Sequence, residues 1–339
     1  MASMKDIARM ANVSQATVSR VLSGHPVVKP DTRQNVLYWA KKLNYQPNAA
    51  AQSLAGSSTN LLGVVFPEIA NPFFSEILAS LEETASFEGY NILLNCTYKS
   101  AEREKNILND LKRRNVDGII TIPVSSKDSA PSYKALNIPT VSITKQMEGF
   151  NSISVSHYQG GQKIAQHLLS LGYQKVGYVG PVSQSTSSIK FQGFHDFVLE
   201  HGMELADVIE TPVPATIDSM IMYQTTKEYL NNGTLSSQAL FANDDVTACD
   251  VIRALSEKGY SVPGDVAVIG FDNSLLAKKM YPSISSLSQP LREIGQQAVY
   301  LMLRILNKEL TEVSSYVLDT RVISRDSTVS TVTEQTEHR

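Results

Sequence analysis

Cysteine and long apolar runs are scarce in this 339-residue sequence, and their scarcity excludes several classes of protein. The only two cysteines, Cys96 and Cys249, lie far apart in apolar or helical contexts, which favours buried thiols over a disulfide. No apolar run reaches the roughly 18 residues that a membrane span requires, and the N-terminus lacks the apolar segment of a signal peptide. We therefore expect a soluble, cytoplasmic protein that does not enter a membrane.

Motifs for catalysis and metal binding are also missing. None of the six His is grouped with a nucleophile and an acid, and no Cys/His spacing suggests a metal site. The sequence has no Gly-x-Ser-x-Gly and no Gly-rich phosphate loop, and the Gly160-Gly161 pair lacks the dinucleotide-binding pattern. An enzyme is therefore disfavoured, and no metal or other cofactor is predicted.

Two short helices joined by a tight turn are predicted within residues 5–24. Their apolar faces consist of Ile7, Ala8, Ala11, Val18, Val21 and Leu22. Ser14 can cap the second helix through its hydroxyl. The side chains expected at its exposed start, where a recognition helix meets base edges, are Ser14, Gln15, Ala16, Thr17, Ser19 and Arg20. The spacing fits a helix-turn-helix, although a plain pair of antiparallel helices fits it equally well.

A third helix is predicted to begin at Lys29-Pro30, since proline suits the first helical turn. Its buried stripe is expected to contain Val36, Leu37, Ala40 and Leu43. The single Trp39 falls within this stripe, so a place in the core is favoured over stacking on nucleic acid. Residues 1–46 are thus expected to form an all-α headpiece.

The charge is distributed unevenly along the chain. Residues 1–60 contain seven Lys/Arg and two Asp, a formal charge of +5, and the rest of the chain carries −8, for a net charge of −3. A basic segment on an acidic body directs one end of the molecule towards phosphate. Ordinary variation in surface charge is the alternative, and the coincidence with the helix-turn-helix pattern disfavours it.

Three sequence runs resemble the signature of the lactose/galactose-repressor family. They are Ala-Thr-Val-Ser-Arg-Val-Leu at residues 16–22, Tyr-Gln-Pro-Asn at 45–48 and Ser-Leu-Ala-Gly at 53–56, and the resemblance extends over nearly the whole chain. It implies a sequence-specific transcriptional regulator, most simply a repressor, that binds pseudo-palindromic operator DNA as a homodimer. A polar tail at 326–339, without apolar heptads, favours a dimer over a tetramer.

The resemblance also implies a hinge at residues 47–59 that becomes helical only on operator DNA. Asn48, Ala51 and Leu54 are its expected DNA contacts, and Leu54 matches the family's minor-groove wedge. A flexible linker, with Leu54 packed on the following domain, is the alternative.

From residue 60 onward, short β-type runs alternate with amphipathic helices, which predicts parallel sheets with right-handed crossovers. The expected strands are 61–66, 91–96, 118–122, 140–143, 152–155, 175–179, 239–242, 266–270 and late strands within 316–323; the expected helices are 72–88, 102–114, 159–171, 188–200, 218–231, 246–258 and 291–306. By resemblance, residues 60–339 form a core of two doubly wound α/β lobes with the periplasmic-sugar-binding architecture. The N-lobe takes about 60–156 and 290–320 and the C-lobe about 157–289 and 321–330, with crossings near Ser156, Gln289 and Thr320.

Aromatic and polar side chains follow several predicted strands, where α/β lobes bind small ligands. A hydrophobic helix start is a fair rival explanation for one ring of the Phe73-Phe74 pair, and helix capping is the favoured role of Asp244. By resemblance, the expected effector contacts are Phe73, Phe74, Tyr98, Thr144, Lys190, Asn243, Asp272 and Gln289. The expected effector is a sugar or a sugar derivative.

Two of these positions depart from the family pattern. Thr144-Lys145 replace the family's Asp-Arg, and Lys190 replaces an Arg, so that a point charge stands where a planar fork is usual. Without the carboxylate at position 144, Lys190 loses its usual counter-charge, which favours an anionic effector such as a sugar phosphate or sugar acid. Alternatively, Asp272 could supply the negative charge that Lys190 lacks, and the effector would then be a neutral sugar.

Two alternatives concern the whole protein. A pure solute-binding protein would carry a signal peptide and no basic headpiece, and the sequence shows the reverse. In the other alternative, a partner protein such as a phosphocarrier regulates the protein in place of a sugar. The polar residues expected in the cleft oppose this alternative only weakly.

Overall fold

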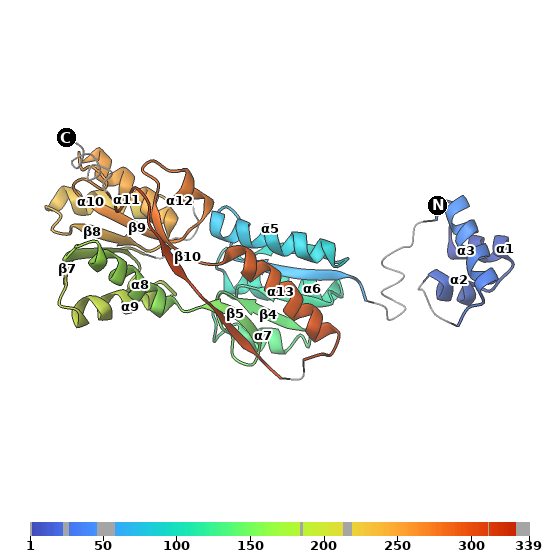
Figure 1. The fold of residues 1–339 in the computed structure, drawn as a ribbon. Coiled ribbons are helices and arrows are strands. Elements are labelled where there is room, and N and C mark those ends of the chain that lie inside the picture. The colour runs from blue at the N-terminus through green and yellow to red at the C-terminus, as the bar shows by residue number, and fades with distance from the viewer. Residues whose placement is uncertain are drawn as a thin grey trace. The chain divides into compact units, whose positions relative to one another are not determined.

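A computed structural model describes residues 2–22, 27–45, 58–183, 186–212, 219–310 and 312–329. The chain divides into two compact units, Met1–Thr59 and Asn60–Arg339. The described residues of the first unit form three helices, and the second is the larger α/β unit (Figure 1). Most of the predicted hinge, with Asn48, Ala51 and Leu54, lies outside the described residues.

The first unit is a helix-turn-helix followed by a third helix. Its elements are α1 (Met4–Ala11), α2 (Gln15–Leu22) and α3 (Pro30–Lys42). Ser3 and Asp6 form a reciprocal capping box at the start of α1, and Asn12 ends that helix in the left-handed conformation with φ 52°. The Asn35 side-chain amide donates to the Ala11 carbonyl over 3.0 Å, which fixes α3 to the turn.

The apolar face of this unit largely follows the prediction. The buried core residues are Ile7, Ala8, Ala11, Val18, Val21, Val36 and Ala40, and Trp39 packs against them from α3. Leu37 is an error of the sequence interpretation, because 47% of its side chain is exposed. Its position next to Val36 places it on the outer side of α3, away from the stripe that Val36 and Ala40 form.

The described residues of the second unit form two six-stranded sheets. The N-lobe sheet has the order β11-β5-β4-β3-β1-β2 and is parallel throughout. The C-lobe sheet has the order β12-β10-β9-β8-β6-β7, and its β10–β12 pair is antiparallel. The strands are β1 (Leu61–Phe66), β2 (Asn91–Cys96), β3 (Gly118–Thr121), β4 (Thr140–Ile143), β5 (Asn151–Val155), β6 (Lys175–Gly180), β7 (Glu204–Glu210), β8 (Ala239–Ala242), β9 (Ala267–Asp272), β10 (Ser285–Ser288), β11 (Ser315–Leu318) and β12 (Arg321–Ile323).

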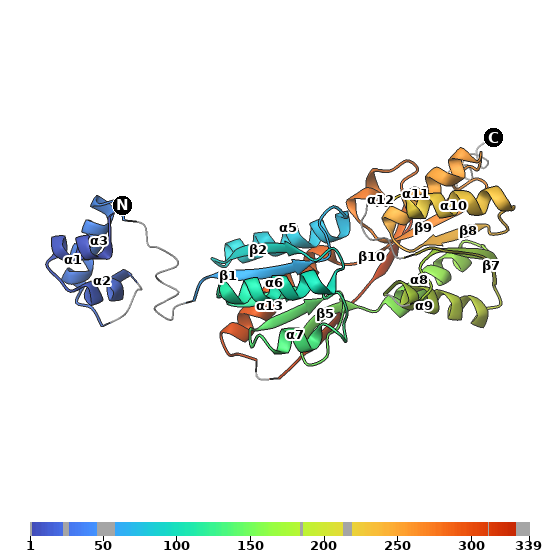
Figure 2. The same ribbon diagram turned by 180° about the vertical axis from the view of Figure 1, so that it is seen from behind.

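Helices cover both faces of each sheet. They are α5 (Pro72–Phe87), α6 (Ala101–Arg113), α7 (Ala130–Lys134), α8 (His157–Ser170), α9 (Thr186–Glu200), α10 (Ile221–Asn232), α11 (Asp245–Glu257), α12 (Leu275–Lys279) and α13 (Leu291–Leu306). In the N-lobe, α5 and α13 pack on one face and α6 and α7 on the other (Figures 1 and 2). In the C-lobe, α8 and α9 cover one face and α10, α11 and α12 the other. The predicted fold class is thereby confirmed.

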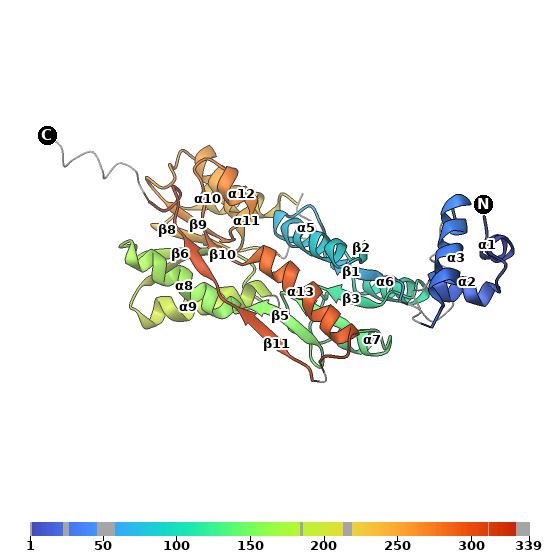
Figure 3. The ribbon, with the colours of Figure 1, turned by 45° about the vertical axis from the view of Figure 1, so that its right-hand side comes forward.

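The chain passes between the lobes three times. Ser156 separates β5 from α8, Gln289 and Pro290 separate β10 from α13, and Asp319 and Thr320 separate β11 from β12. The last crossing divides the region predicted as late strands, with β11 beside β5 in the N-lobe and β12 beside β10 in the C-lobe (Figure 3). These crossings form the junction between the two lobes.

The sequence interpretation missed β7, β10, α7 and α12. β10 reads Ser-Ser-Leu-Ser and carries no apolar run, yet Ser285 and Ser286 are fully buried. Ser286 donates to the Asp245 carboxylate over 2.6 Å, and the Ser285 hydroxyl lies 2.6 Å from that of Thr328. These tertiary hydrogen bonds replace the hydrophobic pattern that identifies a buried strand.

The two cysteines are free, which confirms the absence of a disulfide between them. Both are half-buried rather than fully buried, and burial raises the pKa of each thiol. Among the described helices, none combines the length and apolar character that crossing a membrane demands.

Candidate functional site

The second helix of the headpiece presents the residues predicted to read DNA. Ser14, Gln15, Ala16 and Arg20 are exposed, while Thr17 and Ser19 are half-buried. The Thr17 backbone N–H donates to the Ser14 hydroxyl over 3.1 Å, which confirms Ser14 as the helix cap. Val18 and Val21 bury the opposite face. The recognition roles of these side chains stay predictions.

The second candidate site lies at the carboxyl ends of the C-lobe strands. Lys190, on α9, is buried, and its ammonium group donates to the Asn243 carbonyl over 3.0 Å at the end of β8. The same Nζ lies 3.9 Å from the centre of the Phe271 ring in β9. The next residue, Asp272, accepts a 2.6 Å hydrogen bond from the Gln289 side-chain amide. Four of the predicted effector contacts thus meet around Phe271.

Charge is only partly compensated in this cluster. Burial raises the pKa of Asp272 well above its ordinary value, and the positive charge of Lys190 opposes that rise. Within the described residues, no carboxylate oxygen lies within 4.0 Å of the Lys190 ammonium group. Lys190 is therefore held by a carbonyl and an aromatic face rather than by an ion pair.

Strained backbone marks the strand ends that face this junction. Thr144 follows β4 with φ 62°, and Asp272 and Asn273 have φ 114° and 57°. Residues other than glycine rarely adopt such values, and they persist where the surrounding structure or a function requires them. Thr144 is buried, and its N–H donates to the Ile153 carbonyl over 2.8 Å, so this strained end is tied to β5.

Three further predicted contacts, Phe73, Phe74 and Tyr98, belong to the N-lobe. Within the described residues they make no contact with the Lys190 cluster. Phe73 is buried in the N-lobe core, and Phe74 is half-buried with its ring 5.1 Å from that of Phe73. Tyr98 is 51% exposed, and the Arg103 guanidinium covers its ring at 4.8 Å. Asp244 caps α11 by accepting from the Thr247 N–H over 2.8 Å, which confirms its predicted role.

His157 is the residue of this site that the sequence interpretation missed. It is the first residue of α8, directly after the crossing at Ser156, and its ring centre lies 5.8 Å from that of Phe271. Burial, reinforced by the charges of Lys190 and Lys145, lowers its pKa to about 3, while the nearby Thr144 backbone opposes this shift. The imidazole is therefore neutral at physiological pH. A search for catalytic groupings overlooks it, and only its place next to a lobe crossing could have indicated it.

A close approach of α8 and α9 fixes the positions of His157 and Lys190. A Cβ atom added at Gly161 would collide with the Lys190 carbonyl oxygen, and one added at Gly193 would collide with the Tyr158 carbonyl group. The colliding atoms belong to the backbone, so no side-chain rotation could relieve them. The two glycines hold Lys190 beside the first turn of α8.

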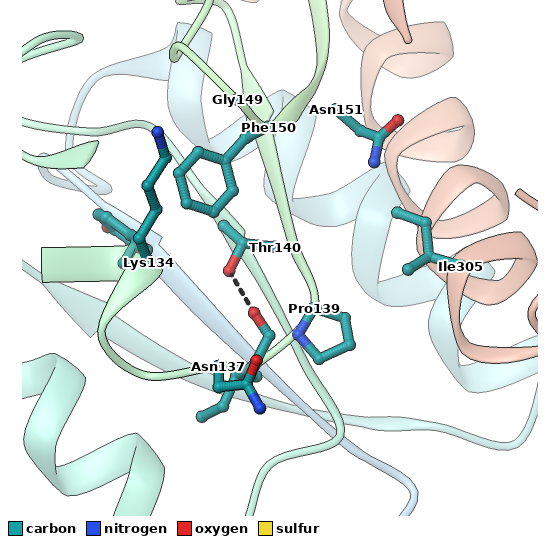
Figure 4. A pocket seen from close by; sticks show the side chains of 10 residues that line it. Lys134, Asn137, Pro139, Thr140, Gly149, Phe150, Asn151 and Ile305 are labelled. Carbon is teal, nitrogen blue, oxygen red and sulfur yellow. Dashed lines mark hydrogen bonds between the residues drawn. The ribbon is translucent and has the colours of Figure 1, made fainter. Parts of the chain in front are cut away.

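A separate hollow of about 370 Å³ lies at the other end of the N-lobe sheet (Figure 4). Its lining includes Thr140 and Asn151, the first residues of β4 and β5, and Ile305 near the end of α13. Because small ligands of parallel sheets bind at the carboxyl ends of strands, we do not assign the effector to this hollow. Nor do the described ranges contain a group of three or more His, Cys, Asp or Glu side chains suited to a metal.

Comparisons with known proteins identify the family. The model of bacterial regulatory proteins of the lacI family matches residues 3–48, and a periplasmic binding protein-like domain matches residues 165–328. Catabolite control protein A of Priestia megaterium is 32% identical over 329 residues, which cover 95% of this chain and 98% of that protein. The chain belongs to the LacI family. It is accordingly a DNA-binding transcriptional regulator and not an enzyme, as the sequence predicts.

Solved structures support the same assignment for both units of this LacI-family chain. The lac repressor dimer bound to operator and the anti-inducer ONPF matches with a TM-score of 0.82 and 27% identity, over 97% of this chain and 99% of that one. A LacI-family regulator from Enterococcus faecium with bound ribose matches with a TM-score of 0.70 and 27% identity, over 79% of this chain and 98% of that one.

Proposed function

We propose that this protein is a homodimeric repressor of the cytoplasm, bound to the nucleoid, whose operator affinity is set by a sugar-type effector between the two lobes. The observation that carries this proposal is the buried cluster of Lys190, Asp272 and Gln289 at strand ends and at a lobe crossing. Carboxylate and amide groups of this kind exchange paired hydrogen bonds with sugar hydroxyls. Ribose in the Enterococcus faecium regulator supports the class of ligand, and the lac repressor dimer on its operator supports the assembly.

An effector can act only if it binds two states of the core differently. Contacts across the lobes supply such a difference. The Leu275 N–H of the C-lobe donates to the Glu76 carboxylate of the N-lobe over 2.6 Å, and at the third crossing the Lys163 ammonium group of α8 donates to the Thr320 carbonyl over 2.6 Å. Opening or closing the lobes would break or form these hydrogen bonds, and the hinges of the dimer would transmit the change to the headpieces.

We further propose that the effector carries an anionic group. Lys190 has no carboxylate within ion-pair distance in the described chain, and both Lys190 and Lys145 lower the pKa of His157. Asp272 feels the charge of Lys190, yet its carboxylate accepts its hydrogen bond from Gln289, so the Lys190 ammonium group is held only by a carbonyl and an aromatic ring and can meet an anion of the ligand.

A thermal-shift screen of the full chain tests the effector class. Neutral sugars, their phosphates and their uronates are added at saturating concentration, because a ligand of the folded state raises the apparent melting temperature. At least one sugar should raise the melting temperature of the core, with the phosphate or the uronate above its neutral parent. If no member of the panel acts, the sugar proposal fails, and regulation by a partner protein becomes the better hypothesis.

Base recognition is proposed to rest on Gln15, Ala16 and Arg20 of α2. Gln can pair with adenine, Ala can touch a thymine methyl group and Arg can pair with guanine in the major groove. Replacing Arg20 by Ala should cost about 1–3 kcal/mol of operator binding and relax specificity at one base pair. Selection from randomised sites measures this change. Arg9→Ala, on the exposed surface of α1, is the control and should leave the selected sequence unchanged.

The hinge is proposed to wedge Leu54 between base steps of the minor groove. Leu54→Ala should therefore weaken operator binding by at least about tenfold and non-specific binding far less, since only the specific complex unstacks bases. Binding titrations with operator and with random DNA give the two affinities, and the melting temperature of the core serves as the control. Equal losses on both DNAs would show that Leu54 is part of a plain linker.

A further inference from the structure

Three buried hydrogen-bonding atoms at the lobe junction lack partners within the described chain. They are both ring nitrogens of His157 and the side-chain oxygen of Gln289. The Thr144 backbone raises the pKa of His157 as a weak acceptor does, but it lies outside the geometry of a hydrogen bond to either ring nitrogen. Buried polar atoms are almost always hydrogen-bonded, because leaving one unpaired costs its full desolvation free energy. Elsewhere the described residues leave only single atoms unpaired, on Ser142, His167 and Thr211. The gathering of three unpaired atoms is peculiar to the lobe junction.

The two side chains belong to one cluster. The His157 ring packs against Phe271, whose ring also lies 3.9 Å from the Lys190 ammonium group. Asp272, the next residue in β9, holds the Gln289 amide nitrogen over 2.6 Å and so leaves the Gln289 oxygen for another donor. His157 begins α8 directly after one lobe crossing, and Gln289 lies in a second one. Each unpaired group therefore lies where the lobes join.

The missing partners have a definite chemistry. A neutral imidazole offers one N–H donor and one acceptor nitrogen, and the Gln289 oxygen is a second acceptor. Complete pairing requires one acceptor and two donors from outside the protein. A phosphate or a carboxylate supplies acceptors alone, whereas two hydroxyl groups supply both donors and an acceptor.

We infer that His157 and Gln289 are effector contacts that receive two hydroxyl groups of a polyhydroxylated ligand. This inference rests on the proposed sugar-type effector and deepens it, because it assigns the hydroxyls and the anionic group to different parts of the cleft. The hydroxyls lie between His157 and Gln289, and the anionic group lies towards Lys190. His157 is then a specificity-determining residue, since it accepts only ligands that can donate to its bare nitrogen.

His157→Phe tests the inference, with His167→Phe as the matched control. His167 lies on the same helix α8, and its Nε2 atom is also buried and unpaired. Without ligand, His157→Phe should melt at or above the wild-type temperature, because it removes two unpaired nitrogens and keeps an aromatic ring against Phe271. It should lose the rise in melting temperature caused by sugar, whereas His167→Phe should keep it. His157→Gln, which restores a donor and an acceptor, should recover part of the response even if the Phe variant folds poorly.

The probes are D-ribose, D-glucose and D-glucose 6-phosphate, followed by monodeoxy analogues of whichever binds the wild-type chain most tightly. At least one deoxy analogue should bind the wild type about tenfold more weakly than its parent sugar does. The same analogue and its parent should bind His157→Phe with equal affinity. A full sugar response in His157→Phe would overturn the inference while the sugar proposal stands, and would assign the unpaired atoms to bound water. A wild-type chain that responds to no probe would instead contradict the sugar proposal itself.

Discussion

Replacing Lys190 by Met is expected to abolish the preference of the cleft for an anionic sugar derivative over its neutral parent. A buried ammonium group that meets a ligand anion makes a charge-assisted hydrogen bond, so the preference lost should be roughly tenfold to a hundredfold. Met has nearly the length of Lys and keeps a favourable contact with the Phe271 ring through its sulfur, so the cleft should retain its shape. The neutral sugar should bind Lys190→Met about as well as it binds the wild type.

Calorimetry with matched pairs measures this effect, each neutral sugar against its 6-phosphate and its uronate. Lys175→Met is the control, because Lys175 is half exposed in β6 and pairs with Glu204 outside the Lys190 cluster. Operator binding without effector should not change in either variant. If the neutral sugar binds the wild type more tightly than its anionic partner, Asp272 is the counter-charge of Lys190 and the anionic proposal is wrong.

Replacing Gly193 by Ala is expected to destabilise the core by about 2 kcal/mol or more, as overpacking against atoms that cannot move aside does. The added Cβ would meet the Tyr158 carbonyl group of α8, with the carbonyl carbon only 2.7 Å away. In a helix, Ala is intrinsically better than Gly by roughly 1 kcal/mol, so a net loss of stability reports the clash and not the helix propensity. Separation of α8 from α9 should also displace Lys190 and weaken the response to effector.

Urea unfolding followed by far-ultraviolet circular dichroism measures the stability of the core in this variant. Gly233→Ala is the matched control, since nothing lies within 4 Å of a Cβ at that position, and its unfolding midpoint should stay at the wild-type value. Trp39 is the single tryptophan and belongs to the headpiece, so its fluorescence should report an unchanged first unit. Equal midpoints for Gly193→Ala and Gly233→Ala would show that α8 and α9 have room to separate.

The sequence predicts the elements of this fold best where apolar runs end at turn residues. The bounds of β1, β2, β4, β8 and α13 match the expected ranges. β1 and β8 are buried runs of mainly apolar residues, and α13 carries an apolar stripe that faces the core. β10 escaped prediction because its serines are satisfied by partners distant in sequence, such as Asp245 and Thr328. Leu37 was assigned to the core because a helical stripe of apolar residues does not by itself define its solvent edge.

The candidate effector site was predictable only in part, and largely through the family resemblance. Lys190, Asn243, Asp272 and Gln289 are far apart in the sequence and come together in the structure. The importance of His157 depends on what its ring nitrogens lack, and unpaired atoms have no signature in a sequence. The sequence also left the role of Phe73 open, since a ring at a helix start can face a ligand or the core. In the structure this ring is buried in the core.

The central claim, that an effector in the cleft controls operator binding, is tested most directly by titrating the full chain with operator DNA, with and without saturating effector. The operator is the sequence selected from randomised sites, and the effector is the sugar that most raises the melting temperature of the wild type. For the wild type, the account predicts that saturating effector changes the operator affinity by at least about tenfold. By reciprocity, operator DNA should change the effector affinity by the same factor. His157→Phe should show neither change. An effector that binds the wild type tightly and leaves its operator affinity unchanged would contradict the account.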